Sequence, residues 1–197
     1  MRTANVERKT FETEIKLSLN IDGSGKKSIQ TDIPFFKHML EQFCAHGYFD
    51  IDLELKSLDG DLHHAVEDAA IALGSAFKEA IGDKKGIKRY GNAFIPMDEA
   101  LVLTALDLSG RPFCNTDLNI KEEQTSGFDT ILVKHFFSSF ANSSLTTLHI
   151  KTFYGEDTHH IIEAAFKSFA RAMKQACEID EAHKDIMPST KGVLWFA

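Results

Sequence analysis

The chain contains two copies of a His-His-x-x-Glu pattern, and imidazole and carboxylate groups are common ligands of divalent metal ions. The copies occupy residues 63–67 and 159–163. In a helix the glutamate follows the two histidines by four and three residues, so its carboxylate shares a helix face with each of them. The two adjacent histidines point roughly 100° apart around the helix axis and cannot easily bind one ion together. We therefore expect the two histidines of each copy to serve different metal ions.

Duplication of this pattern favours a metal site over a structural role. A single histidine pair at a helix start is more often a solvent-exposed cap or a hydrogen-bonded polar pair. Here both histidines and the glutamate return at an offset of 96 residues, and residues 132–137 (LVKHFF) correspond to residues 35–40 (FFKHML) at an offset of 97. Core packing has no need to repeat His, His and Glu in one register. With the lone histidine of each segment included, the candidate ligands are His38, His63, His64, Glu67, His135, His159, His160 and Glu163.

The ligand types narrow the metal only partly. Imidazole and carboxylate without thiolate fit manganese, iron, cobalt, nickel or zinc, and disfavour copper(I) and iron–sulfur clusters. The three cysteines, Cys44, Cys114 and Cys177, are odd in number, far apart and in no CxxC pair. This arrangement argues against a disulfide framework and against a thiolate zinc site.

Several cations lie where they could hold an anionic ligand. Arg89 and Arg111 lie in or beside glycine-bounded turns, and Lys167 follows Glu163 by one helical turn. Residues 188–192 (PSTKG) could cradle an anion with backbone N–H groups, hydroxyls and an ammonium group. Each of these features alone is more often solvated surface, so an anion site follows only if they converge on the metal ligands.

Composition excludes several classes of protein. A net charge of -7 and a pI near 5.7 give no electrostatic footprint for nucleic acid. The N-terminus lacks the apolar segment of a signal peptide, and no stretch reaches the 18 or so apolar residues of a membrane span. With 197 residues, 43% of them hydrophobic, the chain can bury a core as one large domain or two small ones. We expect a cytoplasmic protein without membrane or nucleic-acid partners.

The elements that would position the ligands recur twice in the same order. Strands are predicted where apolar and polar residues alternate, and helices where apolar residues recur every three to four positions. In the first half these patterns predict strands at about 11–21, 27–32 and 49–55 and helices at about 34–45 and 63–81. In the second half they predict strands at 100–108, 113–120 and 145–153 and helices at 128–141 and 159–177.

Each half therefore has the order ββαβα. The first half covers residues 1–87 and the second residues 88–182, followed by a C-terminal tail at 183–197. We expect an internally duplicated α+β fold in which two mostly antiparallel sheets enclose the helices packed between them.

Between about residue 8 and residue 194, the motifs of this chain resemble, in order, the signatures of the imidazoleglycerol-phosphate dehydratase family. The two HHxxE motifs together with the STKG segment are the most specific part of this resemblance. The matching motifs are residues 36–40 (FKHML), 63–68 (HHAVED), 96–101 (PMDEAL), 107–112 (DLSGRP), 135–137 (HFF), 159–167 (HHIIEAAFK) and 188–194 (PSTKGVL).

The resemblance implies a monofunctional hydro-lyase of histidine biosynthesis, which removes water from imidazoleglycerol phosphate to give imidazole acetol phosphate. It also implies two manganese ions per active site, bound by the eight candidate ligands, and a homo-oligomer of 24 subunits with active sites between them. The carbon-bound proton that is removed has no adjacent carbonyl, so the imidazole ring of the substrate is the available electron sink.

The resemblance also assigns roles to further residues. Glu14 and His46 match substrate-contacting positions, and the candidates for proton transfer are Glu14, His38, Glu67 and Glu163. Phosphate binding is assigned to Arg89, Arg111, Lys167, Ser189, Thr190 and Lys191.

Four positions depart from the usual pattern of the family. Lys37 and Lys134 precede the lone ligand histidines where the family commonly has an acidic residue, and Leu62 and Ala65 replace a common Asp and Thr. No expected ligand or phosphate-binding residue is lost. The departures therefore concern the surroundings of His38 and His135, which tune ligands through hydrogen bonds.

Two other functions stay open at this point. A metal-dependent hydrolase also uses paired histidines and a glutamate on one helix, but it needs no second copy. A non-catalytic metal-binding shell needs only the ligands and leaves Arg89, Arg111, Lys167 and the STKG segment unexplained. Turnover of imidazoleglycerol phosphate would separate these functions from a dehydratase.

Overall fold

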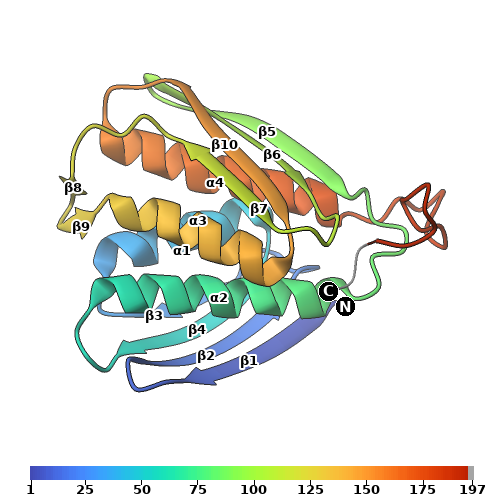
Figure 1. Ribbon diagram of the computed structural model, residues 1–197, viewed down its shortest axis with the longest axis horizontal. Helices are drawn as coiled ribbons and strands as arrows, with labels where there is room; N and C mark the ends of the chain where they lie inside the picture. Colours follow the sequence, from blue (N-terminus) through green and yellow to red (C-terminus); the bar gives the residue numbers. More distant parts are fainter. Residues whose placement is uncertain (195–197) are drawn as a thin grey trace.

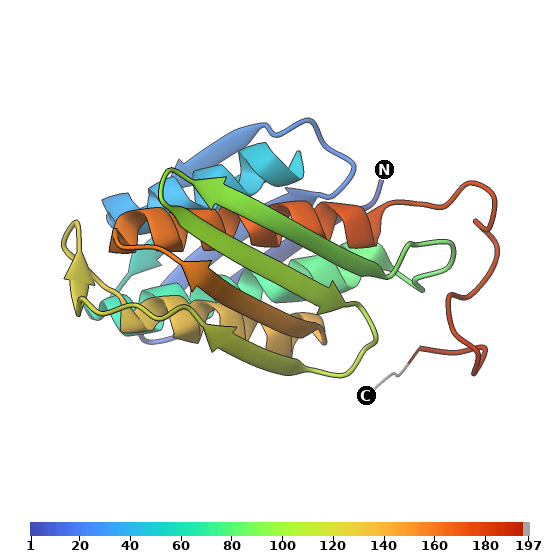
Figure 2. The ribbon, with the colours of Figure 1, turned by 90° about the horizontal axis from the view of Figure 1, so that it is seen from above.

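Two four-stranded sheets enclose four helices in the computed structural model, which describes residues 1–194 (Figure 1). The sheets form the outer layers and the helices lie between them, as the views of Figures 1 and 2 agree. The predicted α+β architecture is confirmed. The last three residues of the predicted tail, 195–197, lie outside the described part of the chain.

The elements of the two halves follow the same order. The first half contains β1 (Thr3–Lys9), β2 (Thr13–Asn20), β3 (Lys27–Gln30), α1 (Pro34–Gly47), β4 (Asp50–Ser57) and α2 (Leu62–Ile81). The second half contains β5 (Tyr90–Met97), β6 (Ala100–Asp107), β7 (Phe113–Asp117), the short pair β8 (Gln124–Thr125) and β9 (Phe128–Asp129), α3 (Ile131–Ser144), β10 (Thr147–Tyr154) and α4 (Thr158–Cys177). None of the helices within residues 1–194 is long and apolar enough to cross a membrane.

The two large sheets share one topology. Their strand orders are β1-β2-β4-β3 and β5-β6-β10-β7. In each sheet three strands are antiparallel, and the fourth, β3 or β7, pairs in parallel with its neighbour. This repeat of topology agrees with the predicted duplication, whereas the boundaries at residues 87/88 and 182/183 stay predictions.

Strand β2 shows how the alternating pattern builds the core. Ile15, Leu17 and Leu19 are buried, while the residues between them face outward. In the antiparallel register with β4, these three residues lie opposite Leu55, Leu53 and Ile51, which are also buried. The apolar face of the sheet is thereby directed at the helices.

Apart from the short pair β8 and β9, each half contains one strand more than predicted, and the order of its main elements is βββαβα. The additional strands β1 and β5 lie at the edges of their sheets. In β1 only Ala4 is fully buried, and in β5 only Gly91, so neither strand has the apolar alternation that the prediction relied on. Gly91 allows β5 to approach α4, because a Cβ atom there would lie 1.8 Å from the carbonyl oxygen of Ala172. Pairing with β2 and β6 forms these strands instead.

The predicted bounds of α3 and the predicted end of β7 are wrong, and α3 ends at Ser144 rather than at residue 141. Helix α3 begins at Ile131 rather than at residue 128, because Phe128 pairs with Thr125 across a turn in which Gly127 has a φ of 73°. Strand β7 ends at Asp117 rather than at residue 120, where its pairing with β10 ends. Apolar spacing alone reveals neither the turn at Gly127 nor the point where the pairing of β7 with β10 ends.

One phenylalanine from each helix belongs to a cluster of four side chains in the centre of the molecule, which we call the phenylalanine cluster. Phe43 of α1 lies 5.0 Å from Phe169 of α4 and 5.8 Å from Phe77 of α2, measured between ring centroids. Phe140 of α3 completes the cluster, with its ring centroid 5.7 Å from that of Phe77 and 4.9 Å from that of Phe169. All four side chains are buried. The phenylalanine cluster packs the four helices against one another.

All four helices begin at the same end of the molecule, on the left in Figures 1 and 2. The paired histidines are the second and third residues of α2 and α4, and the lone histidines are the fifth residues of α1 and α3. Asp61 and Asp157 cap α2 and α4 by accepting hydrogen bonds from the backbone N–H groups of His63 and His159 at 2.8 and 2.7 Å. The fold thus gathers every candidate ligand at one end, which we call the ligand end.

Candidate active site

Three candidate ligands meet where α1 packs against α4. The Nε2 atoms of His38 and His159 each lie 3.1 Å from Oε2 of Glu163. The other carboxylate oxygen of Glu163 accepts from Nζ of Lys167 at 2.7 Å. Burial of Glu163 opposes ionisation, but the hydrogen bonds from Lys167 and His38 outweigh it and lower the pKa of Glu163 to about 2. Glu163 is therefore an anion at neutral pH, in contact with two imidazoles.

A second, more open cluster lies between α2 and α3. Nε2 of His63 lies 3.8 Å from Oε2 of Glu67, and the ring of His135 lies 4.3 Å from that of His63. The hydroxyl of Ser139 donates to Glu67 at 3.3 Å. This cluster has the same composition as the first: two histidines and one glutamate.

Each cluster combines the two halves of the chain. His38 comes from the first half and meets the HHxxE motif of the second, while His135 comes from the second half and meets the motif of the first. Helix pairing explains this exchange, because α1 packs on α4 and α2 packs on α3. The sequence repeat predicted the residues but not this cross-pairing.

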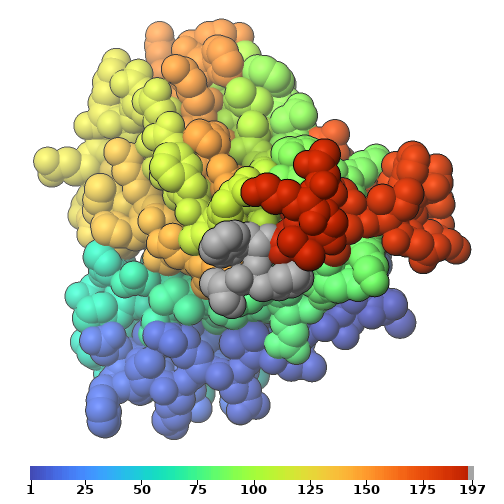
Figure 3. All heavy atoms as spheres, turned by 45° about the vertical axis from the view of Figure 1, so that its right-hand side comes forward, coloured from blue at the N-terminus to red at the C-terminus, as the bar shows by residue number. Residues whose placement is uncertain are grey.

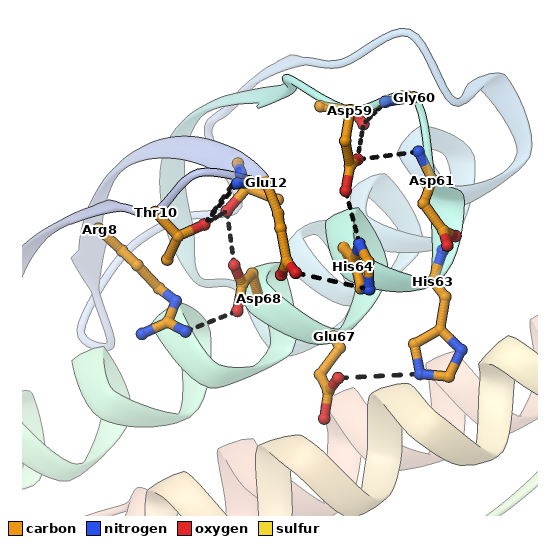
Figure 4. Close-up of polar contacts among 12 residues, drawn as sticks. Arg8, Thr10, Glu12, Asp59, Gly60, Asp61, His63, His64, Glu67 and Asp68 are labelled. Atoms are coloured by element: carbon orange, nitrogen blue, oxygen red, sulfur yellow. Dashed lines mark hydrogen bonds and ion pairs between the residues drawn. The ribbon is translucent and has the colours of Figure 1, made fainter.

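The second histidine of each motif points away from its cluster. Figure 4 shows His63 beside Glu67, while His64 turns toward Asp59 and Glu12. Nδ1 of His64 lies 2.7 Å from Asp59, and its Nε2 lies 3.8 Å from Glu12. The divergence expected from helical geometry is therefore present.

His160 has the same environment as His64, built from other residues. Its Nδ1 lies 2.8 Å from Glu99, and its Nε2 lies 3.8 Å from Asp98. The hydrogen bonds that His64 and His160 donate to Asp59 and Glu99 raise the pKa of each imidazole. Sequence reasoning did not single out these four carboxylates. The sequence feature that could have identified these carboxylates is their position in the loops that precede α2, β2 and β6.

Five of the six predicted phosphate-binding residues line one cavity at the other end of the molecule. This cavity measures about 440 Å³, and residues of the C-terminal tail line part of it. Figure 3 shows the tail on the surface of the molecule, in red. The guanidinium of Arg89 binds Asp107 through two hydrogen bonds of 2.7 and 3.0 Å and donates to the carbonyl of Pro188 at 2.8 Å. The five residues are Arg89, Arg111, Ser189, Thr190 and Lys191. We call this cavity the cationic cradle.

The remaining predicted residues lie elsewhere. Lys167 lies on α4 and binds Glu163 rather than lining the cradle. Glu14 is the second residue of β2 and accepts a hydrogen bond from Nζ of Lys9 at 3.3 Å. His46 lies in the last turn of α1, where burial, followed by the charges of Lys167 and Arg171, lowers its pKa. Arg171, which sequence reasoning missed, lies one turn after Lys167 and stacks on the ring of Tyr48 at 5.5 Å.

The cradle and the ligand end of one chain are too far apart to share a small ligand. The backbone N–H of Arg89 donates to the carbonyl of Ala176, in the last turn of α4. His160 lies in the first turn of the same helix, sixteen residues earlier. At 1.5 Å per residue this separation is about 24 Å.

The family-level departures lie around the ligands without replacing them. Ala65, the third residue of the first HHxxE motif, is fully buried. Lys134 is exposed and lines a cavity of about 550 Å³ at the start of α3, together with Asp129 and Glu122.

The comparisons with known proteins decide the family. The family model of imidazoleglycerol-phosphate dehydratase matches residues 31–173. The chain belongs to the imidazoleglycerol-phosphate dehydratase family. Among its relatives, the dehydratase of Acetivibrio thermocellus is 53% identical over 194 residues, which cover 98% of this chain and 99% of the relative. That of Marinobacter nauticus is 50% identical over 194 residues, covering 98% of each chain.

Solved structures of dehydratases from this family have the same fold. The Staphylococcus aureus enzyme superposes with a TM-score of 0.83 at 36% identity, covering 90% of this chain and 98% of that one. The Pyrococcus furiosus enzyme, solved in complex with (S)-C348, superposes with a TM-score of 0.83 at 38% identity, covering 96% of this chain and all of that one. The resemblance predicted from the motifs is thus confirmed.

Proposed function

We propose that the chain catalyses the removal of water from imidazoleglycerol phosphate to give imidazole acetol phosphate in histidine biosynthesis. The observation that carries this proposal is the pairing of two His-His-Glu clusters at one end with a cationic cradle at the other. A substrate with an imidazole ring and a phosphate group needs a site of each kind. Membership of the dehydratase family selects dehydration from among the reactions that such a site could perform.

We propose that the two clusters hold manganese, with two ions in each active site. The donor set of imidazole and carboxylate suits this ion. In the first cluster the ligand atoms of His38, His159 and Glu163 lie within 4.8 Å of one another, and Glu163 is ionised. Manganese on the substrate imidazole would act as a Lewis acid and stabilise negative charge on the ring. The proposed ligands are His38, His63, His64, Glu67, His135, His159, His160 and Glu163.

The residues around the clusters supply the proton transfers in this proposal. Glu163 touches His38 and Lys167, so a proton taken from the substrate carbon could pass between groups already in hydrogen-bond contact. Glu14 and Glu67 are the other candidate bases, and His46 is the proposed ring contact. Arg89, Arg111, Ser189, Thr190 and Lys191 would hold the phosphate by charge-assisted hydrogen bonds, with Lys167 reaching it from a second chain.

We propose further that each active site lies between copies of the chain in an assembly of 24. The separation of about 24 Å between the ligand end and the cradle supports this arrangement, because one substrate molecule cannot span it. His64 and His160, which point away from their own clusters, would complete the metal coordination of neighbouring copies.

One assay tests the reaction. Manganese-loaded protein is incubated with imidazoleglycerol phosphate, and formation of the enol or keto product is followed. We expect this product without release of inorganic phosphate. Phosphate release would instead indicate a hydrolase, and absence of turnover would indicate a metal-binding shell.

A further inference from the structure

The second histidine of each HHxxE motif is held by a carboxylate at its Nδ1 atom. The contact measures 2.7 Å between His64 and Asp59 and 2.8 Å between His160 and Glu99. Because an ionised carboxylate can only accept, Nδ1 carries the proton of the neutral ring. The lone pair of Nε2 is then free to bind a cation.

Each of these carboxylates is itself fixed to the loop that starts the helix. The second oxygen of Asp59 accepts from the backbone N–H of Asp61 at 2.9 Å (Figure 4). The second oxygen of Glu99 accepts from the backbone N–H of Asp157 at 2.8 Å. Asp61 and Asp157 are the N-caps of α2 and α4. The orientation of the two imidazoles is therefore tied to the helix starts that also orient the clusters.

The two halves of the chain make this contact from different loops. Asp59 lies two residues before the N-cap of α2, and the same place before α4 is occupied by Gly155. A Cβ atom at Gly155 would lie 2.7 Å from Ile161 and 3.0 Å from Ala100, so a side chain does not fit there. Glu99 reaches His160 from the β5–β6 turn instead. The same contact is therefore made in both halves, by carboxylates from different loops.

We propose that Asp59 and Glu99 are positioning residues, which fix the tautomer and the direction of His64 and His160 for metal binding. This inference rests on the proposed function, in which both histidines are ligands. Carboxylates that hold the free nitrogen of a ligand histidine orient the ring, and losing such a partner weakens metal binding by about 10- to 100-fold.

Manganese binding to the full-length chain tests the proposal. We would titrate the wild type, Asp59→Asn and Glu99→Gln with manganese, follow free ion by its electron paramagnetic resonance signal, and record the spectrum of the bound ion. Both variants should bind manganese about 10- to 100-fold more weakly and alter the bound spectrum. Glu99→Asp keeps the charge but shortens the side chain, so it should lose affinity as well.

The matched control is Asp180→Asn. Asp180 makes the same contact with Nδ1 of His183, at 2.8 Å, and His183 is not a proposed ligand. The manganese affinity of the Asp180→Asn variant should equal that of the wild type. Urea unfolding of each metal-free variant should keep the wild-type midpoint, because the proposed role acts through the metal.

Three results would overturn the inference. These are affinities within about threefold of the wild type in both variants, wild-type affinity in Glu99→Asp, and a loss of affinity matched by an equal loss of metal-free stability. If the wild-type chain binds no manganese, the proposed metal site fails, and the inference fails with it. Failure of this inference alone can therefore be distinguished from failure of the proposed metal site.

Discussion

Among the single residues of the ligand end, Glu163 has the most closely defined surroundings. One of its oxygens contacts two imidazoles and the other contacts the ammonium group of Lys167. Only 7% of its side chain is exposed. These contacts hold a negative charge in a fixed place, which suits either a metal ligand or a group that receives a proton.

Glu163→Gln should lower turnover by at least roughly 100-fold, as expected for loss of a residue that transfers a proton. The amide keeps the shape of the side chain but can neither accept a proton nor neutralise Lys167. Turnover should be measured on variant protein whose manganese content equals that of the wild type. Near-normal turnover in such fully metallated protein would remove Glu163 from the mechanism.

Lys191→Ala and Arg111→Ala should each weaken substrate binding by about 1.5–3 kcal/mol, the contribution of a charge-assisted hydrogen bond. Binding of free imidazole or triazole should not change, because these ligands lack the phosphate. Lys184→Ala, an exposed lysine of the same tail that does not line the cradle, serves as the control. Equal weakening of phosphorylated and free ligands would place Lys191 and Arg111 outside the phosphate site.

At the scale of elements, the four helices act as one unit that aligns the ligands. The phenylalanine cluster joins all four helices. Each helix carries its candidate ligand histidines within its first five residues. Both clusters therefore depend on packing in the centre of the molecule.

Phe169→Ala should destabilise the chain by about 3–5 kcal/mol, because it removes a buried ring that contacts two others and leaves a cavity. Phe11→Ala is the control, since Phe11 is fully exposed, and should change stability by less than about 0.5 kcal/mol. Chemical unfolding of the metal-free protein measures both values. Equal changes in stability for the two substitutions would contradict the role of the phenylalanine cluster in packing the helices.

Much of this element order could be predicted from the sequence. Alternation in residues 11–21 and 49–55 predicted the two central strands β2 and β4, because each strand has one face buried against the helices. The edge strands β1 and β5 could not be predicted in this way, since they bury one residue each and are formed by pairing with a neighbour. The start of α3 was predicted three residues too early, because the apolar spacing continues through the turn at Gly127.

The candidate site was predictable as a set of residues but not as an arrangement. The repeat identified all eight candidate ligands, because residue type and spacing are properties of the sequence. Which helix packs on which depends on surfaces far apart in the chain, so the contact of His38 with Glu163 could not be predicted. The partners Asp59 and Glu99 were missed for the same reason, since they come from unrelated loops.

At the scale of the whole molecule, the ligand end and the cationic cradle lie at opposite ends of one chain, about 24 Å apart along α4. A complete site for one substrate then requires two copies, with the ligand end of one facing the cradle of another. Assembly and catalysis are coupled in this arrangement.

Removal of the metal should therefore release smaller oligomers. An ion bound between copies favours the assembled state by its higher affinity for that state. Chelation with EDTA, or acidification below about pH 5.5, one unit under the ordinary pKa of histidine, should dissociate the particle. Hydrogen bonds to Glu99 and Asp59 raise the pKa of His160 and of His64, so these two rings take up protons at a higher pH than an ordinary histidine. Light scattering should show the mass fall with metal content and recover on reloading at neutral pH, whereas constant mass at zero metal would mean that protein contacts alone hold the assembly.

Complementation between two inactive variants tests most directly whether the active site is shared between copies. Glu163→Gln disables the ligand end and Arg111→Ala the cradle, so each variant assembled alone should have little activity. When the two are assembled together in equal amounts, about a quarter of the sites should combine an intact ligand end with an intact cradle, if copies mix at random and two chains form each site. Activity should rise toward that fraction of the wild-type value. Activity no higher than that of the separate variants, in particles shown by mass to contain both chains, would contradict a site shared between copies.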